Sequence, residues 1–415
     1  MKQIWYLSLI LFAATCFQCN VEDPTPDLPD PPVEIFTCVE EPAACELAES
    51  INGFGFDLFR QLHEDAPLEN IFLSPLSVSA ALSMTANGAE NNTLSQMREV
   101  LHQNAMTEAE VNEAFKFYLP ALIDIDPAVT MLPANSIWYD ELFPVYPEFL
   151  ATNQTYFDAQ VEALDFRDPD AASIINSWIE DNTNGKITEM LQSIPADAVM
   201  YLINAIYFKG DWRFQFEEED TYDAVFNNLA GQEENTPMMS FPEGADLPYY
   251  QNAEVQLLDL PFADSVYSMT LMLPNGDNDL DGLIESLTPA NWTAWTDALQ
   301  PQEVRVHLPR FTLEYEEKLN DALTALGMSD AFNRDLCNLD RLSSDPLTYI
   351  SMVKHKSFLE VNEAGSEAAA VTVVEIGTNS VSGYTFRCDE PFLLVIRERA
   401  ANGALFVGKV GSLEE

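Results

Sequence analysis

The sequence predicts one mixed α+β domain, and three observations support that fold class. Runs typical of strands and helices follow one another without the strict alternation of a doubly wound sheet. No linker, internal repeat or change of composition interrupts the chain after Cys45. The 415 residues are 47% hydrophobic and include 25 Phe, which is enough to fill one sizeable core.

Most elements are predicted from the spacing of their apolar residues. The first is an amphipathic helix over 45–63, followed by a short strand, a turn at Ser74 and Pro75, and a helix that stops at Gly88. Another helix starts near Thr93, and two more are expected at 171–183 and 318–326. Strands are expected at 130–139, 198–208, 255–260, 267–273, 304–309, 350–361 and 392–397.

Residues 363–380, EAGSEAAAVTVVEIGTNS, have the pattern of a strand without an obvious neighbour. Every second residue from Ser366 is small or apolar, whereas Glu367 and Glu375 fall on the opposite face. Alanine and glutamate also allow a helix over 366–370, but the β-branched VTVV that follows favours a strand. No Pro occurs in the segment, so every residue can donate to a ladder. We interpret the segment as a strand able to insert into a sheet.

The charge of the chain excludes one class of function. There are 68 acidic and 19 basic residues, a formal net charge of -49 at pH 7, which repels nucleic acid and anionic lipid headgroups. We therefore expect no nucleic-acid partner. A solvated surface suited to salty surroundings explains the acidic residues better than a patch built for one partner.

The N-terminus has the features of an export signal. A single Lys, an apolar run too short to span a bilayer, and then Cys16 and Cys19 resemble the leader of a bacterial surface lipoprotein. The lipidated residue would be Cys19 or Cys16, and an acidic, proline-rich tether follows. We expect a signal peptide at 1–18, a tether at 19–44 and a domain at 45–415, in a protein that is extracellular or held at the cell surface. Plain secretion is the alternative.

Catalytic and metal-binding motifs are missing from the sequence. It contains no GxSxG, HExxH, P-loop or GxGxxG, no CxxC outside the leader, where Cys16 and Cys19 have that spacing, and its four histidines lack ligand spacing. We expect no metal, no cofactor and no enzyme activity; a lipoprotein enzyme that hydrolyses surface polymers is a disfavoured alternative. Cys38 and Cys45 are close enough to pair, whereas Cys337 and Cys388 either pair or remain separate thiols.

Five stretches resemble the serpin family of serine and cysteine protease inhibitors, in family order. They are 70–97, 202–216, 308–332, 353–372 and 389–410. The resemblance implies three β-sheets surrounded by about nine helices, with an exposed reactive-centre loop. It also implies a suicide-substrate mechanism, in which a protease cuts the loop and forms an acyl-enzyme. The cut loop then inserts as a new central strand, and the trapped protease is distorted.

The resemblance also implies roles for individual residues. An inhibitory hinge matches Glu363, Gly365, Ser366, Glu367, Ala368, Ala369 and Ala370. A polar cluster beneath the main sheet matches Ser74, Ser77, Asn204 and His355, and Trp212 matches the point where the loop enters. The same alignment places Cys337 and Cys388 too far apart to bridge, so both are expected as free thiols.

From the family's usual spacing, the resemblance implies a reactive bond at Asn379–Ser380 when the loop is counted forward from Glu363, or at Ser380–Val381 when it is counted back from Pro391. These residues suit a protease that prefers small side chains, elastase-like or subtilisin-like, and a papain-like cysteine protease also fits. Some serpins bind heparin through a basic helix, but here Arg98 is the only Lys or Arg in 93–103, so no heparin partner is expected. We expect a monomeric protease inhibitor, with a non-inhibitory serpin that acts as a binding module as the alternative.

Overall fold

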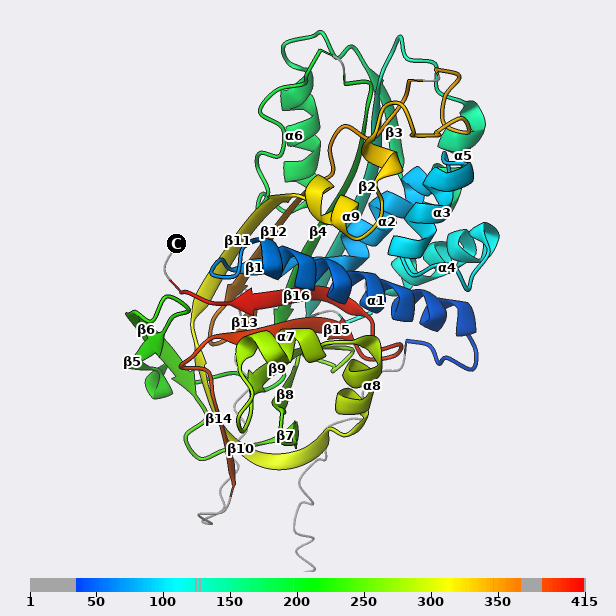
Figure 1. The fold of residues 1–415 in the computed structure, drawn as a ribbon. Coiled ribbons are helices and arrows are strands. Elements are labelled where there is room, and N and C mark those ends of the chain that lie inside the picture. The colour runs from blue at the N-terminus through cyan, green and yellow to red at the C-terminus, as the bar shows by residue number, and fades with distance from the viewer. Residues whose placement is uncertain are drawn as a thin grey trace, which may run out of the picture. The chain divides into compact units, whose positions relative to one another are not determined.

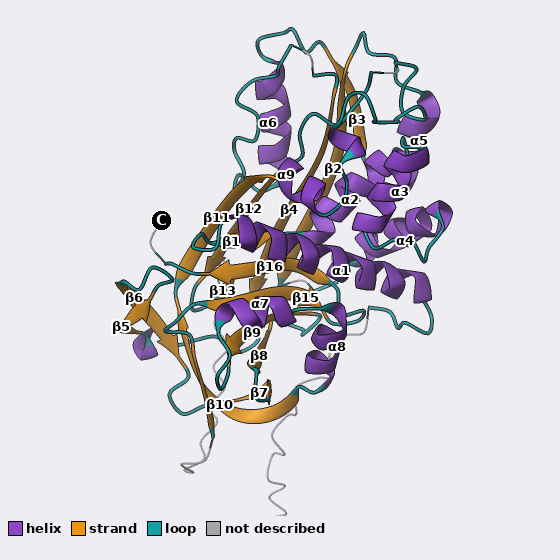
Figure 2. Ribbon diagram, in the orientation of Figure 1, coloured by secondary structure: helices purple, strands orange, loops and turns teal. Residues whose placement is uncertain are grey.

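The computed structural model describes residues 35–123, 125–126, 128–196, 198–345, 347–366 and 383–413. Within these residues nine α-helices surround three hydrogen-bonded sheets of ten, four and two strands (Figures 1 and 2). The predicted α+β class, with three sheets and about nine helices, is confirmed. None of the described helices is long and apolar enough to cross a membrane.

Four of the nine described α-helices begin at a residue whose side chain accepts a hydrogen bond from the first turn. The Ser74 side chain accepts a hydrogen bond from the Ser77 backbone N–H at 3.2 Å, and Pro75 follows at the first helical position. Thr107 and Glu110 form a capping box before another helix. The α-helices are α1 (Pro42–Asp65), α2 (Pro75–Ala86), α3 (Asn91–Val100), α4 (Glu108–Ala121), α5 (Pro147–Phe157), α6 (Ala171–Asn182), α7 (Leu280–Ser286), α8 (Pro289–Asp297) and α9 (Asn320–Ala325).

The ten-stranded sheet forms the larger part of the core. Its order is β1-β16-β15-β9-β8-β7-β10-β6-β5, with β14 pairing to β10. All residues of β15 and β16 are buried, as expected for strands covered on both faces, and α1 lies across β16 (Figure 1). The strands are β1 (Ile71–Leu73), β5 (Tyr222–Asn227), β6 (Glu233–Ser240), β7 (Ala245–Gln251), β8 (Val255–Pro261), β9 (Tyr267–Pro274), β10 (Gln300–Pro309), β14 (Tyr384–Arg387), β15 (Phe392–Glu398) and β16 (Ala404–Val410).

The two smaller sheets carry the candidate site. One has the order β13-β4-β2-β3, and the other pairs β11 with β12. Their strands are β2 (Val129–Asp140), β3 (Gln160–Leu164), β4 (Met200–Asp211), β11 (Phe311–Lys318), β12 (Lys354–Val361) and β13 (Gly365–Ser366). The strand expected at 350–361 begins only at Lys354, because residues 350–353 pair with no strand.

The folded domain begins before the predicted boundary. Phe36 is buried and packs edge-on against Phe117 and Tyr118 of α4, with ring centroids 5.5 and 6.1 Å apart. Helix α1 starts at Pro42. The tether was predicted to extend to residue 44, but Phe36 already packs on the domain before that position. The sequence did not indicate this contact, because Phe117 and Tyr118 lie about 80 residues further along the chain.

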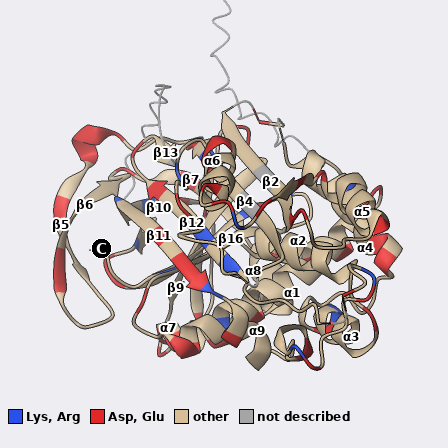
Figure 3. Cartoon of the chain, turned by 90° about the horizontal axis from the view of Figure 1, so that it is seen from above, with Lys and Arg blue, Asp and Glu red and all other residues tan. Residues whose placement is uncertain are grey.

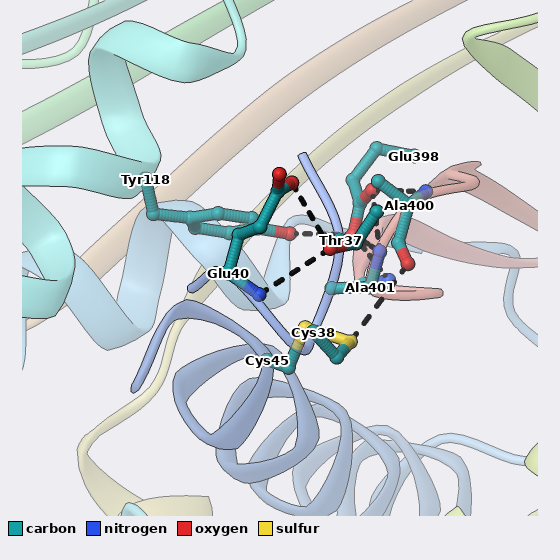
Figure 4. Close-up of a disulfide and its surroundings, with 9 residues drawn as sticks. Thr37, Cys38, Glu40, Cys45, Tyr118, Glu398, Ala400 and Ala401 are labelled. Atoms are coloured by element: carbon teal, nitrogen blue, oxygen red, sulfur yellow. Dashed lines mark hydrogen bonds between the residues drawn. A yellow bond between two sulfur atoms is a disulfide. The ribbon is translucent and has the colours of Figure 1, made fainter. Parts of the chain in front are cut away.

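A disulfide joins Cys38 to Cys45, a pairing that their spacing in the sequence allowed but did not establish (Figure 4). It lies beside the turn between β15 and β16, where the buried Glu398 carboxylate accepts hydrogen bonds from the Tyr118 hydroxyl and from three backbone N–H groups. The other two cysteines of the described residues, Cys337 and Cys388, are free thiols, as predicted. Burial raises the pKa of both thiols, so neither is an activated nucleophile.

Asp and Glu residues are spread over helices, strands and loops in the view from above, and Lys and Arg residues are sparse (Figure 3). Several of the few cations are committed to specific partners. Arg98, for example, donates to the carbonyls of Gln103 and Met106. This pattern is the one expected for a solvated acidic surface.

Candidate functional site

The two smaller sheets meet along β4 and β12, which belong to separate hydrogen-bonded sheets. Within the described residues no ladder joins these two strands. At the end of β4, the indole N–H of Trp212 donates to the Asn362 carbonyl at 3.0 Å, and its backbone N–H donates to the Ala364 carbonyl at 2.9 Å. The two edges are thus tied together at one end through the turn after β12. An edge with unpaired backbone groups can accept another strand.

The predicted hinge begins in that turn. After β12 the chain reverses at an isolated bridge between Asn362 and Gly365, and β13 pairs antiparallel with β4, Gly365 opposite Asp211 and Ser366 opposite Gly210. The start of the segment predicted to insert therefore already lies on the edge of β4. The remaining hinge residues lie outside the described residues, and so do the candidate reactive bonds and lipidation sites: Glu367, Ala368, Ala369, Ala370, Asn379, Ser380, Val381, Cys16 and Cys19.

Gly365 occupies a position that other residues fit poorly. Its φ is +147°, and a Cβ atom built on it would lie 2.2 Å from the Gly210 carbonyl oxygen and 2.6 Å from the Asp211 Cα. Both neighbours are backbone atoms of β4, which cannot move aside as a flexible side chain would. Only glycine allows the hinge to approach β4 this closely.

Trp212, predicted to mark the entry point, is buried and stacks on Phe262, with ring centroids 4.6 Å apart. Its two hydrogen bonds to the turn after β12 connect β4 to the hinge directly. The aromatic stack fixes the indole so that its N–H points at Asn362.

Glu363 anchors the hinge through its side chain and its backbone. Its carboxylate accepts a hydrogen bond from the Thr221 hydroxyl at 2.9 Å and forms an ion pair with Arg310. Its carbonyl accepts the Phe216 N–H at 2.9 Å. Burial alone would raise the pKa of Glu363, but the hydrogen bonds from Arg310 and Thr221 lower it below its usual value. No local sequence signal identifies Arg310 or Thr221 as its partners.

The predicted polar cluster lies where β12 meets α2. The Ser74 backbone N–H donates to His355 Nε2 at 3.2 Å, and its hydroxyl donates to the Leu405 carbonyl at 2.7 Å. Two residues after His355 in β12, the Ser357 hydroxyl donates to the Phe72 carbonyl. The structure thus brings together Ser74, Ser77 and His355 at the N-terminus of α2. For Asn204 only the backbone is described, opposite Asn135 of β2.

A cavity of about 260 Å³ lies between α2, the start of β4 and the approach to β12. Its lining includes Val78 and Leu82 of α2, Leu202 of β4, Ile350 and His355. The cavity therefore lies between the first residues of β4 and the first residues of β12. Sequence reasoning did not predict this cavity, because its walls come from segments far apart in the chain. In the described part of the chain no group of three or more His, Cys, Asp or Glu side chains is arranged to hold a metal ion.

Comparison with known proteins identifies the family. The serpin family profile, described as serine protease inhibitor, matches residues 49–413. The chain is a serpin. It is 34% identical over 375 residues to the leukocyte elastase inhibitor of Xenopus tropicalis, covering 88% of this chain and 99% of that protein. It is 34% identical over 378 residues to the human leukocyte elastase inhibitor, with the same coverage.

Solved serpin structures share the fold of this serpin. Tengpin, a thermophilic serpin, in its native state superposes with a TM-score of 0.81 at 31% identity, covering 88% of this chain and 94% of tengpin. Tengpin in its latent state gives a TM-score of 0.76 at 29% identity, covering 89% and 98%. This serpin therefore resembles the native form more closely than the latent form.

Replacing Glu363 of this serpin with Gln is expected to lower the free energy of unfolding by about 1 kcal/mol, because a partly exposed ion pair and its hydrogen bonds are weakened. The lowered pKa means that the carboxylate stabilises the fold above the pKa of an unfolded Glu. That contribution is lost as pH falls through the folded-state pKa. Chemical unfolding of Glu363→Gln at neutral and acidic pH, with the exposed Glu314→Gln as control, measures both effects. A Glu363→Gln variant as stable as the control at neutral pH would contradict this role.

His355 of this serpin is expected to make the fold sensitive to acid. Burial lowers the pKa of His355 to about 4. An unfolded His titrates near pH 6.5, so between these values the unfolded state binds more protons and stability falls as pH decreases, by roughly 3 kcal/mol in total. Urea unfolding between pH 7 and 4 should show this loss in the native sequence and a flatter profile in His355→Gln. The exposed His102→Gln serves as control, and equal slopes in all three proteins would exclude His355 as the cause.

Proposed function

We propose that this serpin inhibits endopeptidases of serine or cysteine type as a suicide substrate. A protease cuts the loop that follows Ser366, and the severed loop then inserts between β4 and β12 and traps the protease as an acyl-enzyme. The observation that carries this proposal is the hinge: β13 already pairs with β4, at an edge that no other described strand occupies on that side.

The register of β13 supports continued insertion. Extended along β4 and β12, it sets residue 368 opposite Phe208 and Leu359, and residue 370 opposite Ile206 and Ser357. These four partners are buried. The residues that would share their face are Ala368 and Ala370, which bury without a polar or charged group. In the same register Thr372 would lie opposite Asn204 and His355, so a small polar side chain would join the polar cluster.

Relatives of this serpin support the same class of function, since two of them are named leukocyte elastase inhibitors. The expected reactive bonds, Asn379–Ser380 or Ser380–Val381, lack the Arg or aromatic residue of trypsin-like and chymotrypsin-like targets. We therefore propose elastase-like or subtilisin-like proteases, or a papain-like cysteine protease, as the target.

We also propose an extracellular setting for this serpin. The serpin works outside the cell as a monomer, exported by its leader and held to a membrane only through a lipid on Cys19 or Cys16. It has no enzyme activity of its own. It needs no heparin, because α3 and α4 each carry a single basic residue, Arg98 and Lys116.

Incubation with elastase-like, subtilisin-like and papain-like proteases tests the proposal. We expect a covalent complex that survives SDS with at least one of them, and mass spectrometry of the released peptide fixes the cut bond. Cleavage by every protease without a complex would contradict inhibition. That result would favour the alternative, a non-inhibitory serpin that acts as a binding module.

A further inference from the structure

Lys409 and His63 form a buried pair of titratable side chains outside the candidate site. Lys409 of β16 is fully buried, and His63 in the last turn of α1 is 8% exposed. Lys409 Nζ donates to His63 Nδ1 at 3.0 Å. It also donates to the carbonyls of Pro67 and Ala66, at 2.9 and 3.4 Å. All three N–H groups of the ammonium are therefore used inside the protein.

These contacts fix the protonation of His63. The ammonium of Lys409 only donates, so His63 Nδ1 accepts and the ring proton lies on Nε2. That N–H donates to Asp281 Oδ1 of α7 at 3.1 Å. A chain of hydrogen bonds thus runs from the buried lysine, through a neutral imidazole, to a carboxylate whose side chain is 74% exposed. We call Lys409, His63 and Asp281 the α1–β16 latch.

The α1–β16 latch fastens residues 66–70, the connection between α1 and β1, to the end of β16. The side chain of Lys409 holds two carbonyls at the start of the connection, and β1 pairs with β16 directly after it. At the end of the connection, Asn70 Oδ1 accepts the N–H groups of Gly411 and Ser412, at 2.7 and 3.0 Å. The connection therefore also holds the C-terminal residues that follow β16.

A second proton on His63 is incompatible with this arrangement. It turns Nδ1 from an acceptor into a donor, which then faces the Lys409 ammonium with like charge. Nearby carboxylates oppose this effect: Asp281 and Glu64 favour protonated His63, and Asp281 and Glu69 favour charged Lys409. Burial and then the Lys409 charge outweigh the carboxylates and lower the pKa of His63. Burial lowers the pKa of Lys409 to about 8, so at neutral pH the lysine is charged and the histidine neutral.

We propose that the α1–β16 latch is an acid-sensitive switch, in which a proton on His63 breaks its bond to Lys409 and opens residues 66–70. The imidazolium keeps the exposed Asp281 as its partner and turns toward solvent, and Lys409 loses one of its three acceptors. The connection is the part that yields, because Pro67, Leu68 and Glu69 are exposed whereas β16 is buried throughout. The switch does not depend on protease inhibition.

Amide hydrogen exchange of the full-length protein at about pH 7 and about pH 5 tests the switch. The probe is the Glu69 N–H, which donates to the Ala66 carbonyl at 3.3 Å. In the native sequence we expect its protection factor to fall about tenfold at the lower pH, the size expected for losing one hydrogen bond to a charged group. His63→Gln keeps an acceptor for Lys409 without titrating, so it should stay protected at both pH values. Lys409→Met removes the donor and should be unprotected at both.

Two controls separate the switch from general unfolding in acid. His102→Gln removes an exposed histidine and His355→Gln the buried one of the polar cluster, and both should keep the fall in protection. Nitrogen NMR of the native sequence gives a readout that needs no variant: at neutral pH the His63 proton should lie on Nε2. Equal protection of the native sequence at both pH values, an unchanged fall in His63→Gln, full protection in Lys409→Met, or a proton on Nδ1 at neutral pH would each overturn the switch.

Discussion

Gly365→Val is expected to abolish protease trapping while leaving the loop cleavable. The added Cβ would lie 2.2 Å from the Gly210 carbonyl oxygen, and φ of +147° is strained for any side chain. Val therefore has to displace β13 from β4, which removes the first pairing that insertion extends. We expect the yield of SDS-resistant complex per cleavage to fall by about a hundredfold or more, the effect of losing roughly 3 kcal/mol.

Gly231→Val is the matched control for that variant. Gly231 also has a positive φ, of +74°, but a Cβ atom there would meet nothing within 4 Å. The Gly231→Val variant should therefore have a strained backbone but the same yield of SDS-resistant complex as the native sequence. If Gly365→Val traps protease as well as Gly231→Val does, the hinge does not enter along β4.

Moving one carboxylate by one residue is expected to have an effect of similar size. The double variant Glu367→Ala/Ala368→Glu keeps the composition of the chain but shifts the charge to the face that insertion buries. If the proposed insertion continues the register of β13, residue 368 would lie between Phe208 and Leu359, which are both buried. An unpaired carboxylate there costs about 3 kcal/mol or more, so the variant should behave as a substrate and release active protease.

The single variant Glu367→Ala isolates the position of the charge. It lacks the same outward carboxylate but places no charge inside, so its complex yield should match that of the native sequence. The measurement is the number of inhibitor molecules consumed per protease trapped. Equal values for the double and single variants would show that residue 368 is not buried during trapping.

Strong local patterns made part of this structure predictable. Helices α1 and α6 were predicted to within a few residues of their ends, because the spacing of their apolar residues is a local property of the sequence. The alternation of residues in the hinge segment is local in the same way. Helix α4 was missed, although Thr107 and Glu110 form a capping box that the sequence displays. The short strands β5 to β7 were also missed, because their apolar positions are interrupted and their pairing partners lie elsewhere in the chain.

The parts of the site that depend on distant contacts could not be predicted. Glu363 was named from the family pattern, but its partners Arg310 and Thr221 lie 53 and 142 residues away. Lys356 alternates with buried residues, which identifies a strand, yet its carbonyl partner in Glu189 is 167 residues away. The absence of a ladder between β4 and β12 in the described residues is likewise a property of the assembled sheets, because each strand alone has the sequence pattern of any paired strand.

Thermal unfolding of the protein before and after a single cut in the loop tests the central claim most directly. If the severed loop becomes a strand between β4 and β12, the nicked protein gains a full set of backbone hydrogen bonds and buries Ala368, Ala370 and Thr372. It should then melt at least about 5 °C above the intact protein, a shift that corresponds to a gain of a few kcal/mol. A nicked protein that melts at or below the temperature of the intact protein would contradict insertion.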